Sequence, residues 1–321
     1  MDNSLRETKK QASFAKKIVN FPQFSILAAL IALVIIWSLL ANNFFTAGNA
    51  INILRQASTL IIVCTGTTFV LILGGMDLST GAIVGLTGMI SASLLANAGF
   101  GLGIVLIISI LLSAGIGFIN GLIITKARLA PFITTLATMT TVEGIMLLFC
   151  NGRTISGIPD DALFLGRGYI GALPVPTLIM IIVVAVMWIV LRKTKFGRYV
   201  YAIGGNEECA KLSGIRVDLI KNSVYVIAGA VCGLAGLILM LRVGSGQTSL
   251  GDGIMMDAIT ATVLGGTTLA GGKGSMLGTI LGCIFLITLT NGLNVMSVSS
   301  YWQQALTGVV LILAVLLYKK K

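Results

Sequence analysis

Long apolar runs, separated by short polar connections, dominate the pattern of this chain. Each run is close to the roughly 17–25 residues that a helix needs to cross a bilayer, and the runs are continuous rather than alternating, which argues against a membrane β-barrel. The pattern therefore predicts an all-α polytopic membrane protein with about ten transmembrane helices. The predicted spans are about 22–41, 57–73, 79–97, 102–125, 131–150, 177–191, 222–241, 256–270, 276–293 and 301–318.

The amino-acid composition also indicates a membrane protein. Of the 321 residues, 56% are hydrophobic and only 10% are charged, whereas a soluble domain carries roughly 25% charged residues. The chain has no histidine, which removes imidazole metal ligands and histidine acid–base catalysis. Its five cysteines form no CxxC pair, and they fit a role as small apolar filler. We therefore expect neither an enzyme nor a bound metal or cofactor.

The positions of Lys and Arg predict the orientation in the membrane. With the N-terminus inside, 18 of the 22 basic residues fall on the inner side, and only Arg55, Arg153, Arg167 and Arg242 fall outside. Basic residues favour the cytoplasmic side during insertion, so we expect both termini to be cytoplasmic, with residues 1–21 as a tail. The same bias explains the net charge of +11 without a nucleic-acid partner.

Two of the predicted connections are long. Residues 151–176 lie outside and contain three of the five prolines, and residues 192–221 lie inside. Neither connection is long enough for a soluble domain, and none fits at the ends of the chain. We therefore expect residues 1–321 to form a single membrane domain, with neither an ATPase nor a ligand-capturing domain of its own.

Glycine is abundant, and its positions suggest two roles. Segments such as GIGFINGL at 115–122 and GAVCGLAGL at 229–237 predict closely packed helices, because small residues let membrane helices approach. Glycine pairs at 74–75 and 265–266 interrupt apolar runs, and broken helices at membrane depth usually line a cavity. The short, glycine-rich run at 256–270 either crosses the membrane or is re-entrant.

An internal repeat is a further hypothesis. LGGMDLSTG at 73–81 is similar to LGGTTLAGG at 264–272, and NGL occurs at both 120–122 and 291–293. On the predicted spans the first match indicates a parallel repeat and the second an inverted one. Both cannot hold, so the sequence supports internal duplication without deciding its symmetry.

Three carboxylates in or near the spans are candidate functional groups, because a charge at membrane depth is costly. Asp77, in GGMDLST, either caps the next helix, a task that Ser79 could share, or takes a direct part in transport. Glu143 belongs either to a buried polar pair or to the wall of an outward vestibule. Asp257 is similar but lies closer to a boundary. Few other intramembrane charges exist, which weakens a proton-driven mechanism.

The polar stretch GGNEECAKLSGI at 204–215 predicts a short helix on the cytoplasmic side. Asn206 is a suitable N-cap, and two glutamates follow in the first turn, where the helix dipole favours anions. Gly214 can end the helix in a left-handed conformation. Such a helix suits the docking of a separate motor protein. The alternatives are a helix on the membrane surface, for which it is too acidic, or a plain connector.

Several blocks of the chain together resemble the ribose-type permeases of ABC transporters. The blocks cover nearly the whole chain in the family order, and their combination is more specific than any one of them. VEG at 142–144 departs from the basic character expected there, which leaves the role of Glu143 open. The blocks are LGGMDLSTGAIVGLTG (73–88), ARLAPFITTLATM (127–139), GRYVYAIGGNEECAKLSGIRVDLIK (197–221), TVLGGTTLAGGKGSMLGT (262–279) and NGLNVMSVSSYWQQ (291–304).

The resemblance implies a permease of the bacterial inner membrane that imports a monosaccharide. It implies three partners: an ATPase with tandem nucleotide-binding domains, an extracytoplasmic sugar-binding protein, and a second permease copy or homologue. Branched-chain amino-acid permeases share this architecture, so amino-acid import is the alternative. Their loop lacks the sequence GGNE…LSGI, which favours a monosaccharide. A self-contained secondary transporter is a third hypothesis.

The resemblance also implies roles for particular residues. Residues 192–221 would be the cytoplasmic coupling loop, and lipid would surround the spans. We expect the translocation pathway near Asp77, Ser79, Phe132, Glu143 and Asp257. We expect contacts that couple the protein to the ATPase from Gly205, Asn206, Glu207, Ala210, Leu212 and Gly214.

Overall fold

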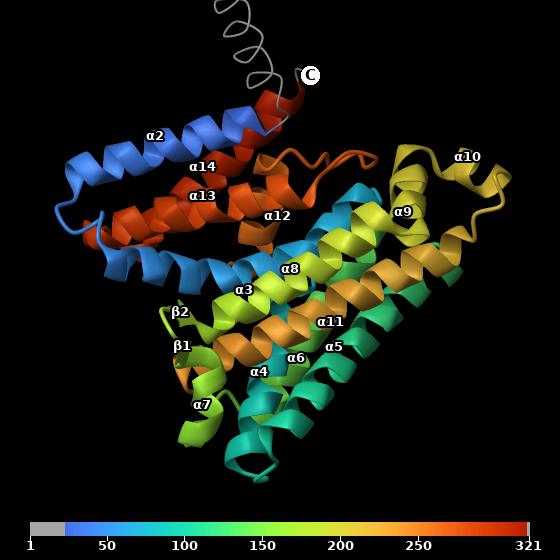
Figure 1. The fold of residues 1–321 in the computed structure, drawn as a ribbon. Coiled ribbons are helices and arrows are strands. Elements are labelled where there is room, and N and C mark those ends of the chain that lie inside the picture. Colours follow the sequence, from blue (N-terminus) through green and yellow to red (C-terminus); the bar gives the residue numbers. More distant parts are fainter. Residues whose placement is uncertain (1–22, 320–321) are drawn as a thin grey trace, which may run out of the picture.

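The computed structural model describes residues 23–319 as a bundle of helices with one small hairpin (Figure 1). The predicted cytoplasmic tail, residues 1–21, lies outside the described residues. Six helices in the described range are long and apolar enough to cross a membrane, so the predicted class of all-α polytopic membrane protein is confirmed. They are α3 (Ala47–Ile72), α5 (Leu102–Lys126), α6 (Pro131–Cys150), α8 (Val175–Lys193), α11 (Val217–Val243) and α13 (Met276–Val295).

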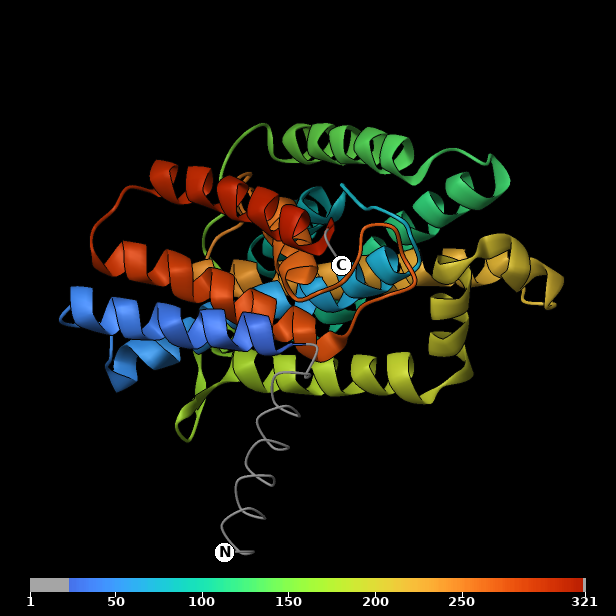
Figure 2. The ribbon, with the colours of Figure 1, turned by 90° about the horizontal axis from the view of Figure 1, so that it is seen from above.

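Helices α3 and α11 form the centre of the bundle. In their apolar segments 78% of the residues are buried, against 22% in α5, α6 and α8. α11 packs against α3, α4 (Thr80–Ala96) and α5. α2 (Phe24–Leu40), α13 and α14 (Ser300–Lys319) gather on one flank (Figure 1), and α13 packs between the other two (Figure 2). The outer helices therefore present most of the surface that meets lipid or a partner.

Small residues bring α5 and α11 into close contact. A Cβ atom on Gly117 of α5 would overlap the carbonyl oxygen of Tyr225 on α11, and one on Gly229 would overlap that of Ser113. The Ser113 hydroxyl donates to the carbonyl oxygen of Ser109 (2.7 Å), so it is satisfied within its own helix. The close packing predicted from the glycine-rich segments is therefore confirmed for this pair of helices.

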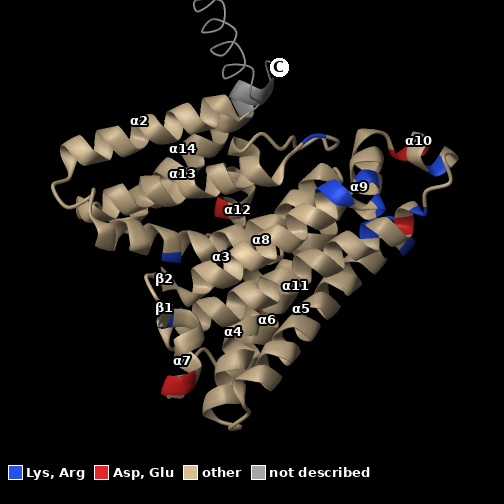
Figure 3. Ribbon diagram, in the orientation of Figure 1, with Lys and Arg blue, Asp and Glu red and all other residues tan. Residues whose placement is uncertain are grey.

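The two ends of the bundle differ in structure and in charge. At one end α8 is followed by α9 (Lys195–Gly205) and α10 (Glu207–Leu212), and Lys and Arg gather there (Figure 3). The other end carries α7 (Asp160–Arg167) and an antiparallel hairpin of β1 (Tyr169–Ile170) and β2 (Leu173–Pro174). The bias of basic residues along the sequence thus has a counterpart in space.

Several helices extend beyond the limits that the apolar pattern predicts. α3 starts at Ala47, well before the predicted residue 57, because the Thr46 hydroxyl accepts a hydrogen bond from the Asn49 N–H (3.2 Å) and caps it. α7, in the predicted outer connection, is fixed by Arg167, whose guanidinium donates to the carbonyl oxygens of Arg242 (2.8 Å) and Val243 (2.6 Å). A helix can therefore be longer than its apolar run. The apolar run is the part that can lie in lipid, and polar residues continue the helix beyond that part.

The predicted span at 256–270 is wrong as a continuous helix. α12 (Ile254–Leu264) has 11 residues, which at about 1.5 Å per residue span roughly 16 Å, about half of the hydrocarbon core. Gly265 and Gly266 follow it, and Gly266 has a φ of +94°, which favours glycine and ends the helix. α3 likewise ends just before the other predicted glycine pair.

Residues 244–253 supply the rest of this discontinuous element. They contain turns rather than helix, and they run alongside α4. Gly246 lies next to Ala92, near one end of α4, and Gly251 lies next to Gly81, near the other end. These two positions on α4 are about 16 Å apart along the helix axis. The chain therefore re-enters the bundle from the end of α11 before α12 begins.

Candidate functional site

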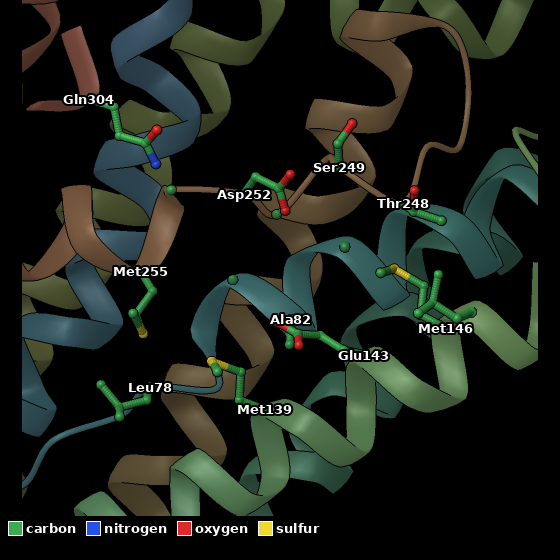
Figure 4. A pocket seen from close by; sticks show the side chains of 15 residues that line it. Leu78, Ala82, Met139, Glu143, Met146, Thr248, Ser249, Asp252, Met255 and Gln304 are labelled. Atoms are coloured by element: carbon green, nitrogen blue, oxygen red, sulfur yellow. The ribbon is translucent and has the colours of Figure 1, made fainter. Parts of the chain in front are cut away.

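A cavity of about 570 Å³ lies between α4, α6, the 244–253 segment, α12 and α14. Its volume is within the roughly 300–1,000 Å³ of small-molecule pockets. Met139, Met146 and Met255 form apolar parts of its wall, and Figure 4 shows Glu143 reaching from α6 toward Ala82 of α4. The polar side chains of its lining are Glu143, Thr248, Ser249, Asp252 and Gln304.

Glycine allows the 244–253 segment to reach this cavity. Gly244 ends α11 with a φ of +83°, and Gly253 precedes α12 with a φ of +76°. A Cβ atom on Gly251 would overlap the carbonyl oxygen of Gly81 on α4. Left-handed backbone and close backbone approach both favour glycine. Thr248, Ser249 and Asp252 of the segment thereby line the cavity, where Ser249 and Asp252 remain exposed.

Glu143 faces the cavity and has no ion-pair partner. Both ion pairs among the described residues involve Glu207, and no hydrogen bond to the Glu143 side chain occurs within residues 23–319. The alternative of a buried polar pair is therefore wrong, and Glu143 lies in a cavity wall. Asp252 adds a second carboxylate to the same wall, and an ionised carboxylate is purely a hydrogen-bond acceptor. The cavity thus offers acceptors to a ligand that carries donors.

A second cavity, of about 520 Å³, adjoins the first, because Asp252 and Gln304 line both. Asp257 and Thr260 of α12 contribute to its wall. The Thr260 hydroxyl is buried without a hydrogen-bond partner in the described structure. Of the carboxylates predicted for the pathway, Glu143 and Asp257 therefore lie in two cavities that share part of their lining.

Asp77, Ser79 and Phe132 line neither cavity. Phe132 is half exposed on α6. Asp77 is buried, and its Oδ1 accepts hydrogen bonds from the Ser79 N–H (2.9 Å) and the Ser79 hydroxyl (2.6 Å). Ser79 is the N-cap residue of α4, but its own hydroxyl does not cap the helix. Asp77 thus stabilises the turn from which α4 starts.

A buried polar network links this turn to the neighbouring helices. The Asn120 side-chain amide of α5 donates to the Ser79 hydroxyl (3.0 Å), and the Thr138 hydroxyl of α6 donates to the Asn120 side-chain carbonyl (2.6 Å). The Thr135 hydroxyl also donates to the carbonyl oxygen of Met76 (3.3 Å). A satisfied network of this kind rigidifies the structure around it. It fixes the start of α4 relative to α6, and both helices line the first cavity.

The predicted short helix of the polar stretch is confirmed as α10. The Asn206 side chain accepts a hydrogen bond from the Cys209 N–H (2.9 Å) at its start. At its end Gly214 has a φ of +80°, and the Ile215 N–H donates to the Ala210 carbonyl oxygen (3.1 Å). This is the pattern of a Schellman C-cap. Six residues therefore keep a helical conformation because both ends are capped.

Glu207 ties α10 to the start of α11. Its carboxylate pairs with Lys211 on the same helix (2.8 Å) and with Lys221 on α11 (2.6 Å). Partial burial raises the pKa of Glu207, but the hydrogen bonds and charges of the two lysines outweigh it and bring the pKa below its ordinary value. The pair with Lys221 fixes how α10 projects from the end of the bundle.

The faces of α10 differ from what the sequence suggests. Ala210 is only 4% exposed and belongs to a buried cluster with Val217 and Ile220 of α11. Its methyl group faces its own protein, so the expectation that Ala210 contacts a partner needs correction. Leu212 is 89% exposed at the end of the same helix. Leu212 is therefore the large apolar side chain that α10 exposes.

Three backbone segments meet below α9 at a point that we call the glycine junction, formed by Gly74, Gly204 and Gly271. A Cβ atom on Gly204 of α9 would overlap the carbonyl oxygen of Ile72, and one on Gly271 would lie 2.9 Å from Gly74. The loop that leads into α4 and the loop that follows α12 thus come together here. Gly205, by contrast, has nothing within 4 Å of an added Cβ.

Hydrogen bonds strengthen this junction. The Tyr201 hydroxyl of α9 donates to the Gly274 carbonyl oxygen (2.8 Å), and the Gly272 N–H donates to the Ile72 carbonyl oxygen (2.8 Å). The junction therefore connects α9, and through it α10, to the two elements that line the cavities.

Sequence reasoning missed Asp252, Gln304, Asn120 and Gly204. The sequence signal for Asp252 was present: four glycines and several polar residues occur in GSGQTSLGDG at 244–253, more than a short outer loop needs. Gln304, Asn120 and Gly204 could not be identified from the sequence around them, because the role of each depends on which segment packs against it in the fold. Within the described residues no group of His, Cys, Asp and Glu could hold a metal ion.

Comparisons with known proteins give a consistent result. The family described as branched-chain amino acid transport system / permease component matches residues 49–315. The ribose import permease protein RbsC of Bacillus subtilis is 44% identical over 294 residues, which cover 91% of each chain. The protein of the same name from Escherichia coli is 42% identical over 299 residues, 92% of this chain and 93% of its own. The D-allose transport system permease protein AlsC of Escherichia coli is 34% identical over 310 residues, 96% and 94% of the two chains. No solved structure matches this chain.

Proposed function

Because this chain belongs to the family of permease components of branched-chain amino acid transport systems, we propose that it imports a ribose-like monosaccharide as the membrane-spanning permease subunit of an ABC transporter. Two of its relatives, at 42–44% identity, are named as ribose import permeases. It is a multi-pass protein of the bacterial cytoplasmic membrane. It forms the translocation pathway, while a separate ATPase hydrolyses ATP, and the permease itself is not an enzyme.

The lining of the two cavities is the observation that carries this proposal. Carboxylates, two amides and hydroxyl groups accept and donate the hydrogen bonds that the several hydroxyls of a sugar require. Neither lining contains Lys or Arg, which are the usual partners of the carboxylate of a free amino acid. The sugar would pass Glu143 and Asp252 and then the region of Asp257.

One observation favours the alternative of a branched-chain amino acid. α12 begins at the cavities, with Gly253 before its first turn in both linings. The N-terminus of a broken membrane helix is suited to an anionic group of a substrate. Import of a branched-chain amino acid is therefore the second candidate, and a direct comparison of substrates separates the two.

We also infer ten crossing segments with both termini in the cytoplasm. The six long helices are joined by α2, α4 and α14, and the 244–253 segment with α12 forms the discontinuous eighth crossing. The gathering of Lys and Arg at the α9–α10 end supports this orientation (Figure 3). Single cysteines placed at Ser13, Ser156 and Lys320 should be labelled from the inside, outside and inside, and labelling of Lys320→Cys from outside would reject an even number of crossings.

The proposed partners fit the two ends of the bundle. The ATPase docks at α10, where Leu212 is exposed and residues 205–214 form the coupling segment. The sugar-binding protein meets the opposite end, at α7 and the hairpin. A second permease copy or homologue packs against the exposed apolar side of α6, which includes Phe132 and Leu148. Lipid covers the remaining outer faces.

The glycine junction supports a route for coupling. ATP-driven movement of α10 would shift α9, which follows directly from the spanning helix α8 and rests on the junction through Gly204. The junction includes the loop before α4 and the loop after α12. A shift there would change the distance between α4 and α12, which line the first cavity on different sides. The network of Asp77 and Asn120 holds the start of α4 as a unit during that movement.

The substrate is tested by uptake into membrane vesicles that contain the permease, its ATPase and its binding protein. We expect ATP-dependent uptake of labelled ribose that unlabelled leucine does not inhibit. Glu143→Gln should reduce the uptake, while Thr140→Ala, a change on the same helix outside both cavities, should not. Uptake of labelled leucine with no uptake of ribose would replace the sugar assignment with the second candidate.

A further inference from the structure

An apolar groove of about 420 Å³ lies between α3, α8 and α13. Ile61 of α3 and Ile280 of α13 form two of its walls, and α8 forms the third. Among the described residues that line it, the Trp188 indole N–H is the one polar side-chain group. Ile181 and Leu277 of the lining are 49% and 52% exposed. The groove is therefore open on the lipid-facing surface of the spanning helices.

The spacing of residues along α8 produces this groove. Ile181, Val184, Ala185 and Trp188 all line it, and residues three and four apart lie on the same face of a helix. Ala185 is the smallest of the four, so the surface of the helix is hollowed at its position. From Ile181 to Trp188 the groove follows α8 for about 10 Å, which is most of the roughly 15 Å depth of one leaflet.

Two cations follow the groove at the end of α8. Arg192 lies one turn after Trp188, and Lys193 is the last residue of the helix. The Lys193 Nζ lies 5.9 Å from the centroid of the Trp188 ring, a distance at which an aromatic ring attracts an ammonium group. This contact holds a positive charge at the end of the groove. The surface thus changes from apolar to charged along the axis of a single helix.

The helices that form the groove carry no carboxylate to offset these cations. Within the described structure α3, α8, α13 and the following α9 contain neither Asp nor Glu. Glu207 and Glu208 lie on α10, which α9 separates from α8 (Figure 3), and both ion pairs among the described residues belong to Glu207. The end of the groove therefore carries an unbalanced positive charge.

We propose that an anionic phospholipid of the inner leaflet occupies this groove. Its phosphate meets Arg192 and Lys193, since both side chains donate to phosphate oxygens, and one acyl chain follows the apolar face of α8 past Ala185. The choice of leaflet rests on the proposed topology. α6, the proposed contact with a second permease copy, lies on the opposite side of the bundle from α8 (Figure 2), so such a copy leaves the groove to lipid.

The bound lipid has a consequence for coupling, because α8 is tied directly to α9. The Thr194 hydroxyl donates to the Val190 carbonyl oxygen (2.6 Å) and accepts from the Gly197 N–H (3.3 Å). A Cβ atom on Gly197 would overlap the Leu191 carbonyl oxygen, so the two helices meet closely. A lipid that holds the end of α8 against α3 and α13 thereby also holds the start of α9.

The test uses the full-length permease with its ATPase in phosphatidylcholine nanodiscs that contain a small fraction of a lipid with brominated acyl chains. Bromine quenches indole fluorescence on contact, so the difference between the wild type and Trp188→Phe reports the lipid at Trp188. We expect brominated phosphatidylglycerol to quench Trp188 at a roughly tenfold lower fraction than brominated phosphatidylcholine, because two cations meet its headgroup. Arg192→Gln/Lys193→Gln should abolish this preference. The matched control Lys195→Gln/Arg198→Gln removes two exposed cations of α9 and should keep it.

A second pair of variants tests the shape of the groove. Ala185→Phe fills it, whereas Val186→Phe places the same side chain at an exposed position of α8 outside the lining. Mass spectrometry of lipid retained after purification should show less phosphatidylglycerol on Ala185→Phe than on Val186→Phe. Equal retention by these two variants, or equal quenching of the wild type by the two brominated lipids, would indicate ordinary surrounding lipid and overturn the proposal.

Other occupants give distinct results in the same assays. Reversal of the quenching by soluble glycerol 3-phosphate would indicate a site for free phosphate, without a bound acyl chain. Stronger quenching after removal of residues 2–21 would assign the groove to the N-terminal tail. Dissociation of permease dimers by Ala185→Phe, at unchanged quenching, would assign it to a second copy. Each of these results would overturn the proposal, and none depends on which substrate the permease transports.

Discussion

Truncation of Leu212 should weaken binding of the ATPase while leaving the permease folded. Leu212 is 89% exposed at the end of α10, so the folded permease gains little from its side chain. The caps of α10 at Asn206 and Gly214 do not involve it. The change Leu212→Ala therefore leaves the helix in place and removes only the apolar group that it presents to a partner.

The size of the effect follows from burial of that side chain in the complex. Full burial of a leucine side chain contributes about 1.5–3 kcal/mol, and about 1.4 kcal/mol corresponds to a tenfold change in affinity. Leu212→Ala should thus weaken association with the ATPase by roughly ten- to a hundredfold. The matched control is Leu129→Ala, an apolar side chain that is 48% exposed in the connection between α5 and α6 at the same end of the bundle.

The assay is a titration of labelled ATPase against permease in nanodiscs, with the thermal midpoint of each permease variant measured in parallel. We expect weaker binding for Leu212→Ala at an unchanged midpoint, and wild-type binding for Leu129→Ala. Ala210→Asp is unsuitable as a test, because it would place an unpaired carboxylate in the buried cluster beneath α10 and displace the helix. Equal affinities for wild type and Leu212→Ala would refute the assignment of α10 as the docking helix.

Three further outcomes follow from the site. Gly204→Ala should uncouple ATP hydrolysis from uptake, because its methyl group would overlap the Ile72 carbonyl oxygen, whereas Gly115→Ala on α5, where an added Cβ has nothing within 4 Å, should be neutral; equal uptake by both variants would exclude the glycine junction from coupling. Asp77→Asn should keep most of the uptake, since an amide oxygen can still accept a hydrogen bond from Ser79. Asp77→Leu should lower the free energy of unfolding by about 1–3 kcal/mol. An equal loss of uptake in both variants, at equal protein levels, would mean that the charge of Asp77 itself matters. Glu143→Gln should slow sugar uptake by roughly tenfold, or about 1.4 kcal/mol, at normal ATPase binding, and unchanged uptake would remove it from the pathway.

The sequence was most informative where structure depends on neighbouring residues. The caps of α10 could be predicted because Asn206 and Gly214 act on the backbone within four residues of themselves. The breaks after α3 and α12 could be predicted for the same reason, since glycine pairs end apolar helices locally. The class of the fold followed from the lengths of the apolar runs.

The face that a residue presents could not be predicted in the same way. Ala210 was expected to contact the ATPase because its loop resembles the family loop, but an alanine can pack against its own protein as well as against a partner. Leu212 is the exposed one because α10 packs its other side on α11. Asp252 was missed because apolar length cannot show that a polar segment runs back along α4. Such features depend on contacts between elements far apart in the sequence.

The central claim is that the protein passes a sugar through the membrane only with an ATPase bound to it. The most direct test is accumulation of labelled ribose in proteoliposomes made from the purified permease, ATPase and sugar-binding protein. We expect accumulation that requires ATP and all three components and that a proton gradient cannot replace. Accumulation by the permease alone, driven by a proton gradient without ATP or ATPase, would identify a secondary transporter and contradict the claim.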